Sequence, residues 1–320
     1  MNHPLPAYRG WTLVELLVAM TLSLLVIAGI SQIYLAAKQS YGIQNSLAQL
    51  QDVGRYVTEL LTRDIHNAGY WGLLTSSVGV INSTPPSASC NMTGETTWGT
   101  MVQQKIFGFD NTQNPTGYAC IDSSRTVGDV LTLRYGNPSN PSNPTNPFTT
   151  TPYSGSGLYI RTTPTSGDIE LGPAGASPPT PTMDLELTAH AYYLASSTQA
   201  HECEGTSPSP PPALARESLV TSGPNRGTPY EQELVTGVEE LQFQFGVDTD
   251  GDGSVNKFLD ANNVTDWSQV KAVRFWVLVR DDCPQLDYTD NKTYDMGNRS
   301  FSPNDHYRRA LYTSTATLRN

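Results

Sequence analysis

A long apolar segment near the N-terminus, interrupted by one carboxylate, constrains the fold of this chain most strongly. Residues 13–37 are almost wholly apolar, and Glu15 is the only charged residue among them. About 20 such residues can cross a bilayer as a helix. A carboxylate in such a helix costs roughly 2.5–3.5 kcal/mol at the bilayer centre and less near an end, so it normally faces a partner. The segment therefore predicts a membrane-spanning helix whose single charge is neutralised.

The first ten residues of the chain are polar, include one arginine and end in Gly10. A secretory signal peptide would instead have a shorter apolar core followed by a small-residue cleavage site. Cleavage between Gly10 and Trp11 would create an α-amine four residues before Glu15. The ammonium and the carboxylate could then neutralise each other, within one chain or between packed helices. An uncleaved membrane anchor is the alternative interpretation.

The helical pattern continues beyond the apolar segment. Apolar residues recur at steps of three and four between residues 47 and 65, which indicates one face of a helix. Gly42 and Gly54 should weaken this helix by about 1 kcal/mol each and allow bending. We expect one helix from Thr12 to about Ala68, with its first half in a membrane or a helix bundle and its second half on a soluble domain.

The rest of the chain alternates apolar and polar residues in short segments, as β-strands do. The clearest segments are residues 129–136, 185–195, 241–247 and 271–280. Proline-rich stretches at 137–147 and 206–212 are typical of exposed loops. Sheets with this alternation bury one face, and the long helix is the natural cover. We therefore expect an α+β fold, with a long N-terminal helix packed on an antiparallel β-sheet globular domain that has long loops.

The charge balance argues against one class of partner. The chain has 19 basic and 30 acidic residues, which gives a formal net charge of -11. A protein that follows a phosphate backbone needs basic surface, so we expect no nucleic-acid binding.

The four cysteines are Cys90, Cys120, Cys203 and Cys283, and none forms a C-x-x-C pair. In an exported chain an even number suggests two disulfides, for which three pairings are possible. We favour the pairing of sequence neighbours, Cys90 with Cys120 and Cys203 with Cys283. Four separate buried thiols would suit a cytosolic protein better.

An acidic stretch at residues 248–256, "DTDGDGSVN", matches the first half of an EF-hand-type calcium loop. Alternating carboxylates surround a hard cation, and a glycine permits the sharp turn. The match fails at the twelfth position, which is Leu259, and an Asp-Gly-rich turn between two strands is the alternative. We predict a structural Ca²⁺ site whose candidate ligands are Asp248, Asp250, Asp252, Ser254, Asn256 and Asp260.

No catalytic constellation is evident, so we predict no catalytic residues and no enzyme activity. The chain has no G-x-S-x-G, no H-E-x-x-H and no phosphate-binding glycine loop. The stretch "HECE" (201–204) could offer metal ligands, but we expect Cys203 in a disulfide. We expect core packing for Trp71, Trp98, Trp267 and Trp276.

Five blocks of the sequence are typical of one protein family. The start, "GWTLVELLVA", is similar to the class III signal of prepilins, with Trp11 in place of the usual Phe. The further blocks are "GRYVTELLTRDIHNAGYWG", "HAYYLA", "ELVTGVEELQFQFGVDTDGDG" and "DWSQVKAVRFWVLVR". All pilins and pseudopilins share the first block, and with the later blocks the chain resembles the PilW family of type IV pilus minor pilins.

The resemblance implies a pilin-like fold with a leader peptide at residues 1–10, a transmembrane and assembly helix at 11–72 and a periplasmic β-rich globular domain at 73–320. It implies cleavage between Gly10 and Trp11 by the prepilin peptidase, N-methylation of Trp11, and an assembly role for Glu15.

The resemblance also implies partners and a location. The partners would be other minor pilins, the major pilin and the inner-membrane assembly platform. The protein would start in the inner membrane and move to the cell-surface pilus, where it would prime assembly, sit at the fibre tip and support twitching motility. Two alternatives remain, a J-type pseudopilin of type II secretion and a membrane-anchored, calcium-dependent module for cell adhesion.

Overall fold

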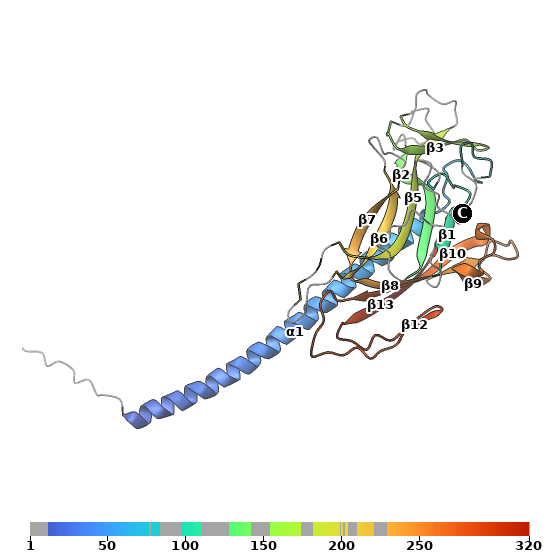
Figure 1. Ribbon diagram of the computed structural model, residues 1–320. Helices are drawn as coiled ribbons and strands as arrows, with labels where there is room; N and C mark the ends of the chain where they lie inside the picture. The colour runs from blue at the N-terminus through green and yellow to red at the C-terminus, as the bar shows by residue number, and fades with distance from the viewer. Residues whose placement is uncertain are drawn as a thin grey trace, which may run out of the picture. The chain divides into compact units, whose positions relative to one another are not determined.

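The computed structural model describes residues 12–76, 78–83, 98–110, 128–141, 154–173, 182–198, 200, 202–203, 210–220 and 229–319 (Figure 1). The leader and Trp11 lie outside this set. The chain divides into two compact units, residues 1–49 and 50–320. The division lies inside the helix, whereas the sequence suggests a boundary after residue 72. The last turns of the helix are therefore part of the β-rich unit.

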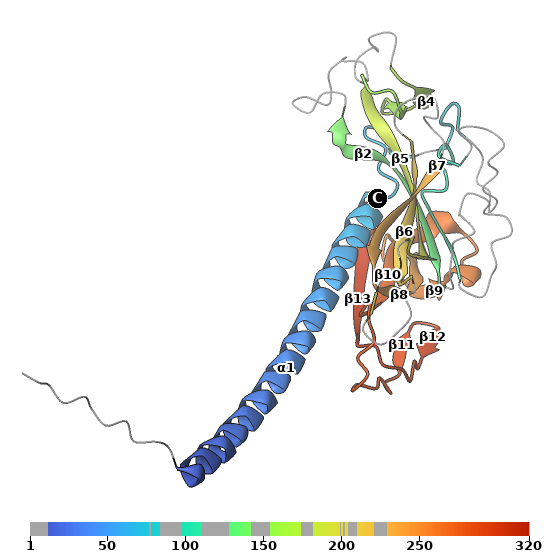
Figure 2. The ribbon, with the colours of Figure 1, turned by 60° about the vertical axis from the view of Figure 1, so that its left-hand side comes forward.

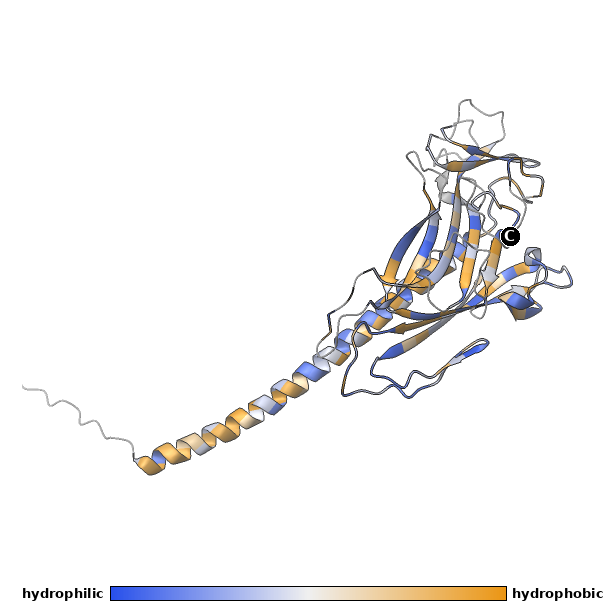
Figure 3. Ribbon diagram, viewed as in Figure 1, coloured by the Kyte–Doolittle hydropathy of each residue, from blue (hydrophilic) through white to orange (hydrophobic). Residues whose placement is uncertain are grey.

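One continuous helix, α1 (Leu13–Asn67), forms the N-terminal part of the described chain, as predicted. In the first unit its apolar side chains are exposed, and Figure 3 shows this stretch as predominantly hydrophobic. The exposed fraction of the Leu25 side chain, for example, is 70%. None of the described residues of this unit belongs to a hydrophobic core, so the stability of this stretch must come from the helix itself and its surroundings.

The part of α1 in the second unit is buried on one face. Leu50, Val57, Leu61 and Ile65 are at most 1% exposed and belong to the main core. The ring of Tyr312 lies where a Cβ atom on Gly54 would be, so the glycine allows close packing. The Tyr312 hydroxyl also donates a hydrogen bond to the carbonyl oxygen of Leu50 at 3.0 Å. Gly54 thus makes room for the Tyr312 ring, in addition to its effect on the stability of the helix.

The larger sheet is antiparallel and has seven strands. These are β1 (Ile106–Phe109), β2 (Val130–Pro141), β3 (Leu158–Thr162), β4 (Gly167–Leu171), β5 (Met183–Ser196), β6 (Pro212–Leu219) and β7 (Pro229–Thr236). The long strand β5 is central, because it pairs with β2, β3 and β6. β2 continues to Pro141, although the Asn-Pro repeat predicts a loop there. A register shift after Gly136 lets the strand accommodate its prolines.

The second sheet has the strand order β13-β10-β8-β9 and is also antiparallel (Figure 2). Its strands are β8 (Val238–Val247), β9 (Lys257–Asp260), β10 (Val270–Arg280) and β13 (Arg309–Thr317). The inward residues of β8 and β10 share one core with α1 and with one face of the larger sheet. A second core covers the other face of the larger sheet. The α+β expectation is therefore confirmed.

A short hairpin of β11 (Tyr294–Met296) and β12 (Arg299–Phe301) precedes the last strand. Acidic side chains surround Arg309, the first residue of β13, whose side chain is fully buried. Its guanidinium donates to Glu239 and Asp305 and lies 3.4 Å from Asp290. A buried cation is stable only when it is paired, so these acids explain the position of Arg309.

A buried polar cluster joins α1 to the larger sheet. The carboxylate of Asp64 accepts hydrogen bonds from the hydroxyls of Tyr135 (3.1 Å) and Tyr192 (2.5 Å) and contacts Nδ1 of His190 at 2.6 Å. Burial works to raise the pKa of Asp64, but these donors outweigh it and the pKa is lowered. Burial lowers the pKa of His190 despite the neighbouring carboxylate. Asp64 is therefore ionised and His190 neutral.

Candidate functional site

The first turn of α1 holds the carboxylate that the sequence marks as functional. One oxygen of Glu15, Oε2, accepts hydrogen bonds from the backbone N–H (3.0 Å) and the hydroxyl (2.9 Å) of Thr12. The Thr12 hydroxyl in turn accepts from the backbone N–H of Glu15 at 3.3 Å. This reciprocal arrangement is a capping box, which the spacing T-x-x-E signals in the sequence. Glu15 therefore has a local role at the positive end of the helix dipole.

The other oxygen of Glu15, Oε1, accepts no hydrogen bond from the residues that the structure describes. The carboxylate is thus fixed at the helix start and still able to accept a further donor. Gly10 and Trp11, the predicted cleavage and methylation positions, lie outside the described residues.

Three hydroxyl groups of the apolar segment satisfy their hydrogen bonds within the helix. The hydroxyls of Thr21, Ser23 and Ser31 donate to backbone carbonyl oxygens three or four residues earlier, at 2.7–2.9 Å. Groups that are satisfied internally can enter hydrocarbon at low cost. α1 is also long and apolar enough to cross a membrane, with a mean hydropathy of 2.5 over its best 18-residue window.

The acidic loop between β8 and β9 brings three of the predicted calcium ligands together. Carboxylate oxygens of Asp248, Asp250 and Asp252 all lie within 4.8 Å of one another. Gly251 and Gly253 have φ angles of 80° and 91°, which a residue with a side chain rarely adopts. Their N–H groups donate to the two oxygens of Asp248 at 2.7 and 2.9 Å.

The remaining predicted ligands have other partners. Asn256 donates from its amide nitrogen to Asp250 at 3.0 Å and accepts from the N–H of Thr249 at 2.6 Å. The backbone N–H of Ser254 donates to Asp252 at 2.7 Å. Asp260 accepts from the side chain of Gln244 at 2.9 Å and is not part of the acidic group. The structure therefore groups three acids and separates Asp260 from them.

The charge of Asp248 is stabilised by the loop itself. Burial works to raise the pKa of its carboxyl group, but the N–H groups of Gly251 and Gly253 outweigh this and the pKa is lowered. Asp248 is consequently ionised at neutral pH. Its two neighbouring acids are exposed.

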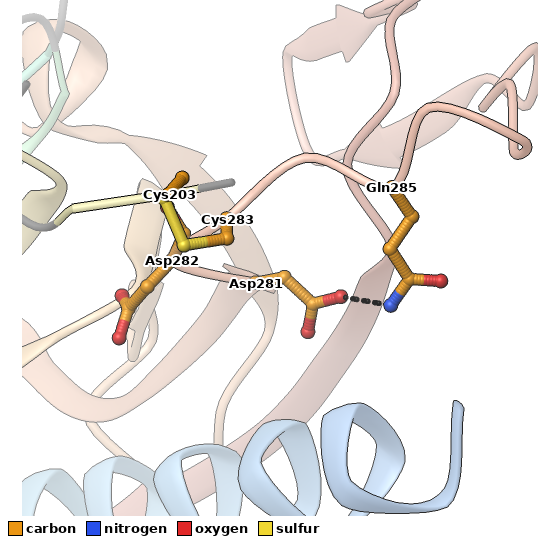
Figure 4. Close-up of a disulfide and its surroundings, with 5 residues drawn as sticks. All are labelled: Cys203, Asp281, Asp282, Cys283 and Gln285. Carbon is orange, nitrogen blue, oxygen red and sulfur yellow. Dashed lines mark hydrogen bonds between the residues drawn. A yellow bond between two sulfur atoms is a disulfide. The ribbon is translucent and has the colours of Figure 1, made fainter. Parts of the chain in front are cut away.

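One disulfide lies within the described residues. Cys203 and Cys283 are bonded, with their Cα atoms 5.4 Å apart, as the favoured pairing predicts (Figure 4). Next to it Gln285 donates from its amide nitrogen to Asp281 at 3.1 Å. The disulfide links the segment before β6 to the segment after β10, and therefore the larger sheet to the smaller one. Cys90 and Cys120 lie outside the described residues.

Two family models match the chain. Residues 191–320 match the family described as type IV pilus-assembly protein W, and residues 6–31 match the prokaryotic N-terminal methylation motif. No curated protein and no solved structure matches the chain. The two matches confirm the resemblance to PilW and the prepilin-type start. The first covers β8, the acidic loop and β10, and the second covers Glu15 and most of the apolar segment.

Proposed function

We propose that this chain, a pilin-like protein related to type IV pilus assembly, is a minor pilin that primes assembly as part of a minor-pilin complex at the fibre tip. The observation that carries the proposal is the Glu15 carboxylate. It is fixed by Thr12 through one oxygen and keeps the other available, at the start of a helix whose apolar side chains are exposed.

The mechanism follows from this arrangement. In the membrane the exposed apolar side chains of α1 contact lipid. In a fibre they contact the helices of neighbouring pilins, and Oε1 of Glu15 accepts a hydrogen bond from the N-terminal ammonium of one neighbour. An ion pair in apolar surroundings is strongly favoured over either charge alone, so it fixes the register of the two subunits. No catalytic step is needed, and we expect none.

The subunit would meet its processing enzyme and its assembly partners in a fixed order. The prepilin peptidase would cut between Gly10 and Trp11, and Trp11 would then be N-methylated. The β domain would face the periplasm until the assembly platform transfers the subunit from the inner membrane to the pilus. Loss of the protein would then reduce twitching motility.

The decisive experiment replaces Glu15 with alanine and compares Glu59→Ala, which removes an exposed acid from the second half of the same helix. We expect Glu15→Ala protein to insert in the membrane normally but to be lost from sheared fibres, with piliation strongly reduced. Glu59→Ala should keep piliation. Normal twitching in the Glu15→Ala strain, or an intact leader on protein isolated from fibres, would contradict the proposal.

Two alternatives make different predictions for a deletion strain. A J-type pseudopilin would leave piliation normal and abolish type II secretion. A membrane-anchored adhesin would leave both normal and reduce only attachment to surfaces.

We propose separately that the acidic loop binds Ca²⁺ in a structural role, because three carboxylates converge there. Asp248, Asp250 and Asp252 would hold the ion. Asp260 would contribute only if it left Gln244. Ca²⁺ should raise the melting temperature of the full-length protein in detergent, and Asp250→Asn should remove this shift. Titration that yields neither heat nor a thermal shift would reject the site.

A further inference from the structure

A cleft of about 460 Å³ lies in the β-rich unit, between the turn after α1, the residues before β1 and the segment that contains the short helix η2 (Trp267–Gln269). Its volume is within the roughly 300–1,000 Å³ that is typical of small-molecule sites. Trp71, Trp267, Lys105, Gln103 and Asp266 are among the lining residues. Nothing in the assembly role described above requires this cleft.

Packing and hydrogen bonds with neighbouring residues fix the positions of the lining residues. The indole of Trp267 packs on the rings of Phe107 and Phe245, with centroids 4.7 and 4.8 Å away. Asp266 accepts hydrogen bonds from the N–H and the hydroxyl of Ser268, at 2.9 and 2.7 Å. On the other side the buried Arg134 donates to the carbonyl oxygen of Gln104 at 2.8 Å. The cleft is therefore preformed, which lowers the entropic cost of binding.

Lys105 is the unexplained group in this cleft. Its side chain is half-buried, and its ammonium has no hydrogen bond or ion pair with any residue that the structure describes. Burial lowers the pKa of Lys105, and the nearby positive charge of Lys271 lowers it further. A half-buried ammonium without a counter-ion is costly, so an anionic group on a ligand would be stabilised there.

The other lining groups define the rest of the ligand. Trp267 is partly exposed and offers an aromatic face, whereas Trp71 is almost fully buried. The exposed side chains of Thr75, Gln103 and Thr265 also line the cleft. Asp266 has an oxygen, Oδ2, that accepts nothing from the described part of the chain. These groups donate to and accept from hydroxyls, as a sugar requires.

We propose that this cleft binds an acidic saccharide, with the apolar face of a pyranose ring against Trp267 and its carboxylate paired with Lys105. The hydroxyls of the sugar contact Asp266 and the neighbouring amide and hydroxyl side chains. A polyanion such as nucleic acid does not suit the site, because the chain carries a formal net charge of -11.

The test compares methyl glucuronide with methyl glucoside, which differ only in the carboxylate. Saturation-transfer NMR would measure binding to the full-length protein, in micelles of a detergent without a sugar headgroup. We expect the glucuronide to bind about tenfold more tightly, through one charge-assisted contact. Lys105→Met should abolish this preference and Lys105→Arg should keep it. Lys257→Met, which removes an exposed lysine outside the cleft, is the matched control and should change nothing.

Several results would overturn the proposal. These are the absence of saturation transfer to either sugar, equal affinity for both sugars in the unchanged protein, and a preference that survives Lys105→Met. Inorganic phosphate that competes as well as the glucuronide would show a simple anion site and would also overturn it. Melting curves of each variant verify that the fold is intact.

Discussion

The two parts of α1 have the same secondary structure and opposite surroundings. From Leu13 to Gln49 its apolar side chains are exposed, whereas from Leu50 to Asn67 one face is buried in the main core. A helix that is apolar on all sides needs a membrane or a bundle of helices, and an amphipathic helix needs a sheet. The difference separates a stretch whose apolar side chains are exposed from a stretch that is packed against the sheets.

The burial of one face of residues 50–67 explains where the compact units divide. A boundary at the end of the helix would leave Leu61 and Ile65 without their core, so residues 50–67 belong with the strands. The exposed half contributes nothing to that core. Substitutions in the two halves should consequently have different effects on the stability of the β-rich unit.

The largest expected effect comes from truncating a buried side chain of the second half. Leu61→Ala should lower the free energy of unfolding of the β-rich unit by about 2–5 kcal/mol, because a cavity remains in the core. Leu25→Ala, in the exposed half, should change it by less than about 0.5 kcal/mol. Urea unfolding of the detergent-solubilised protein, followed by near-UV circular dichroism, measures both. Equal losses of unfolding free energy in the two variants would mean that both parts of α1 contribute to the core of the β-rich unit.

Asp64→Ala should lower the free energy of unfolding by about 3 kcal/mol, because it leaves buried donors on Tyr192, Tyr135 and His190 without an acceptor.

The same cluster of Asp64, Tyr135, His190 and Tyr192 makes the stability of the fold depend on pH. His190 has a pKa below its ordinary 6.5 in the folded state, so its contribution is complete above pH 6.5 and decreases as the pH falls below it. Asp64, with its pKa below 3.8, adds a loss at lower pH.

Thermal unfolding at a series of pH values tests this cluster. His190→Gln should remove the part of the pH dependence that begins at 6.5 and leave the part due to Asp64. A stability that rises on acidification through this range would contradict the assignment of a neutral His190.

The two glycines of the helix should respond to alanine with opposite signs. Gly54→Ala places a methyl group against the ring of Tyr312 and should destabilise the fold by about 1–3 kcal/mol. Gly42→Ala meets no atom within 4 Å and should raise helix stability by up to about 1 kcal/mol. Melting temperatures and far-UV circular dichroism of the two variants provide the measurement. A stabilising Gly54→Ala would show that Tyr312 moves aside without cost.

The smallest expected effect is that of Tyr312→Phe, which removes one hydrogen bond to the Leu50 carbonyl oxygen and keeps the ring. We expect a loss of about 1 kcal/mol. Tyr34→Phe, in the exposed half, is the matched control and should be neutral. A neutral Tyr312→Phe would indicate that Tyr312 stabilises this contact through the packing of its ring and not through its hydroxyl.

The sequence predicted the elements whose pattern is local and periodic. The alternation of Leu241, Phe243 and Phe245 identified β8, and the steps of three and four identified α1. The prepilin-type start was also recognisable, because its motif is contiguous. The grouping of Asp248, Asp250 and Asp252 followed from their spacing.

Contacts between distant segments could not be predicted in the same way. Asp64 and His190 are 126 residues apart, and no sequence pattern relates them. The cleft at Lys105 combines three separate loops, so its lining became apparent only from the fold. Trp267, expected in the core, packs against it through Phe107 and Phe245 but is only partly buried, which its sequence context did not indicate. Asp260 was predicted as a further ligand from its position in the sequence, whereas its hydrogen bond to Gln244 depends on the pairing of β8 with β9 and had no signal there.

The contacts between α1 and β13 have a mechanical consequence. Tyr312 meets Leu50 near one end of the packed helix, while His66 meets Thr317 and Arg319 near the other. Helix and strand thus run in the same direction, and tension on the helix loads these contacts together in shear. Because β13 is also paired along its length with β10, pulling on the helix would strain the whole small sheet at once instead of peeling one strand from it.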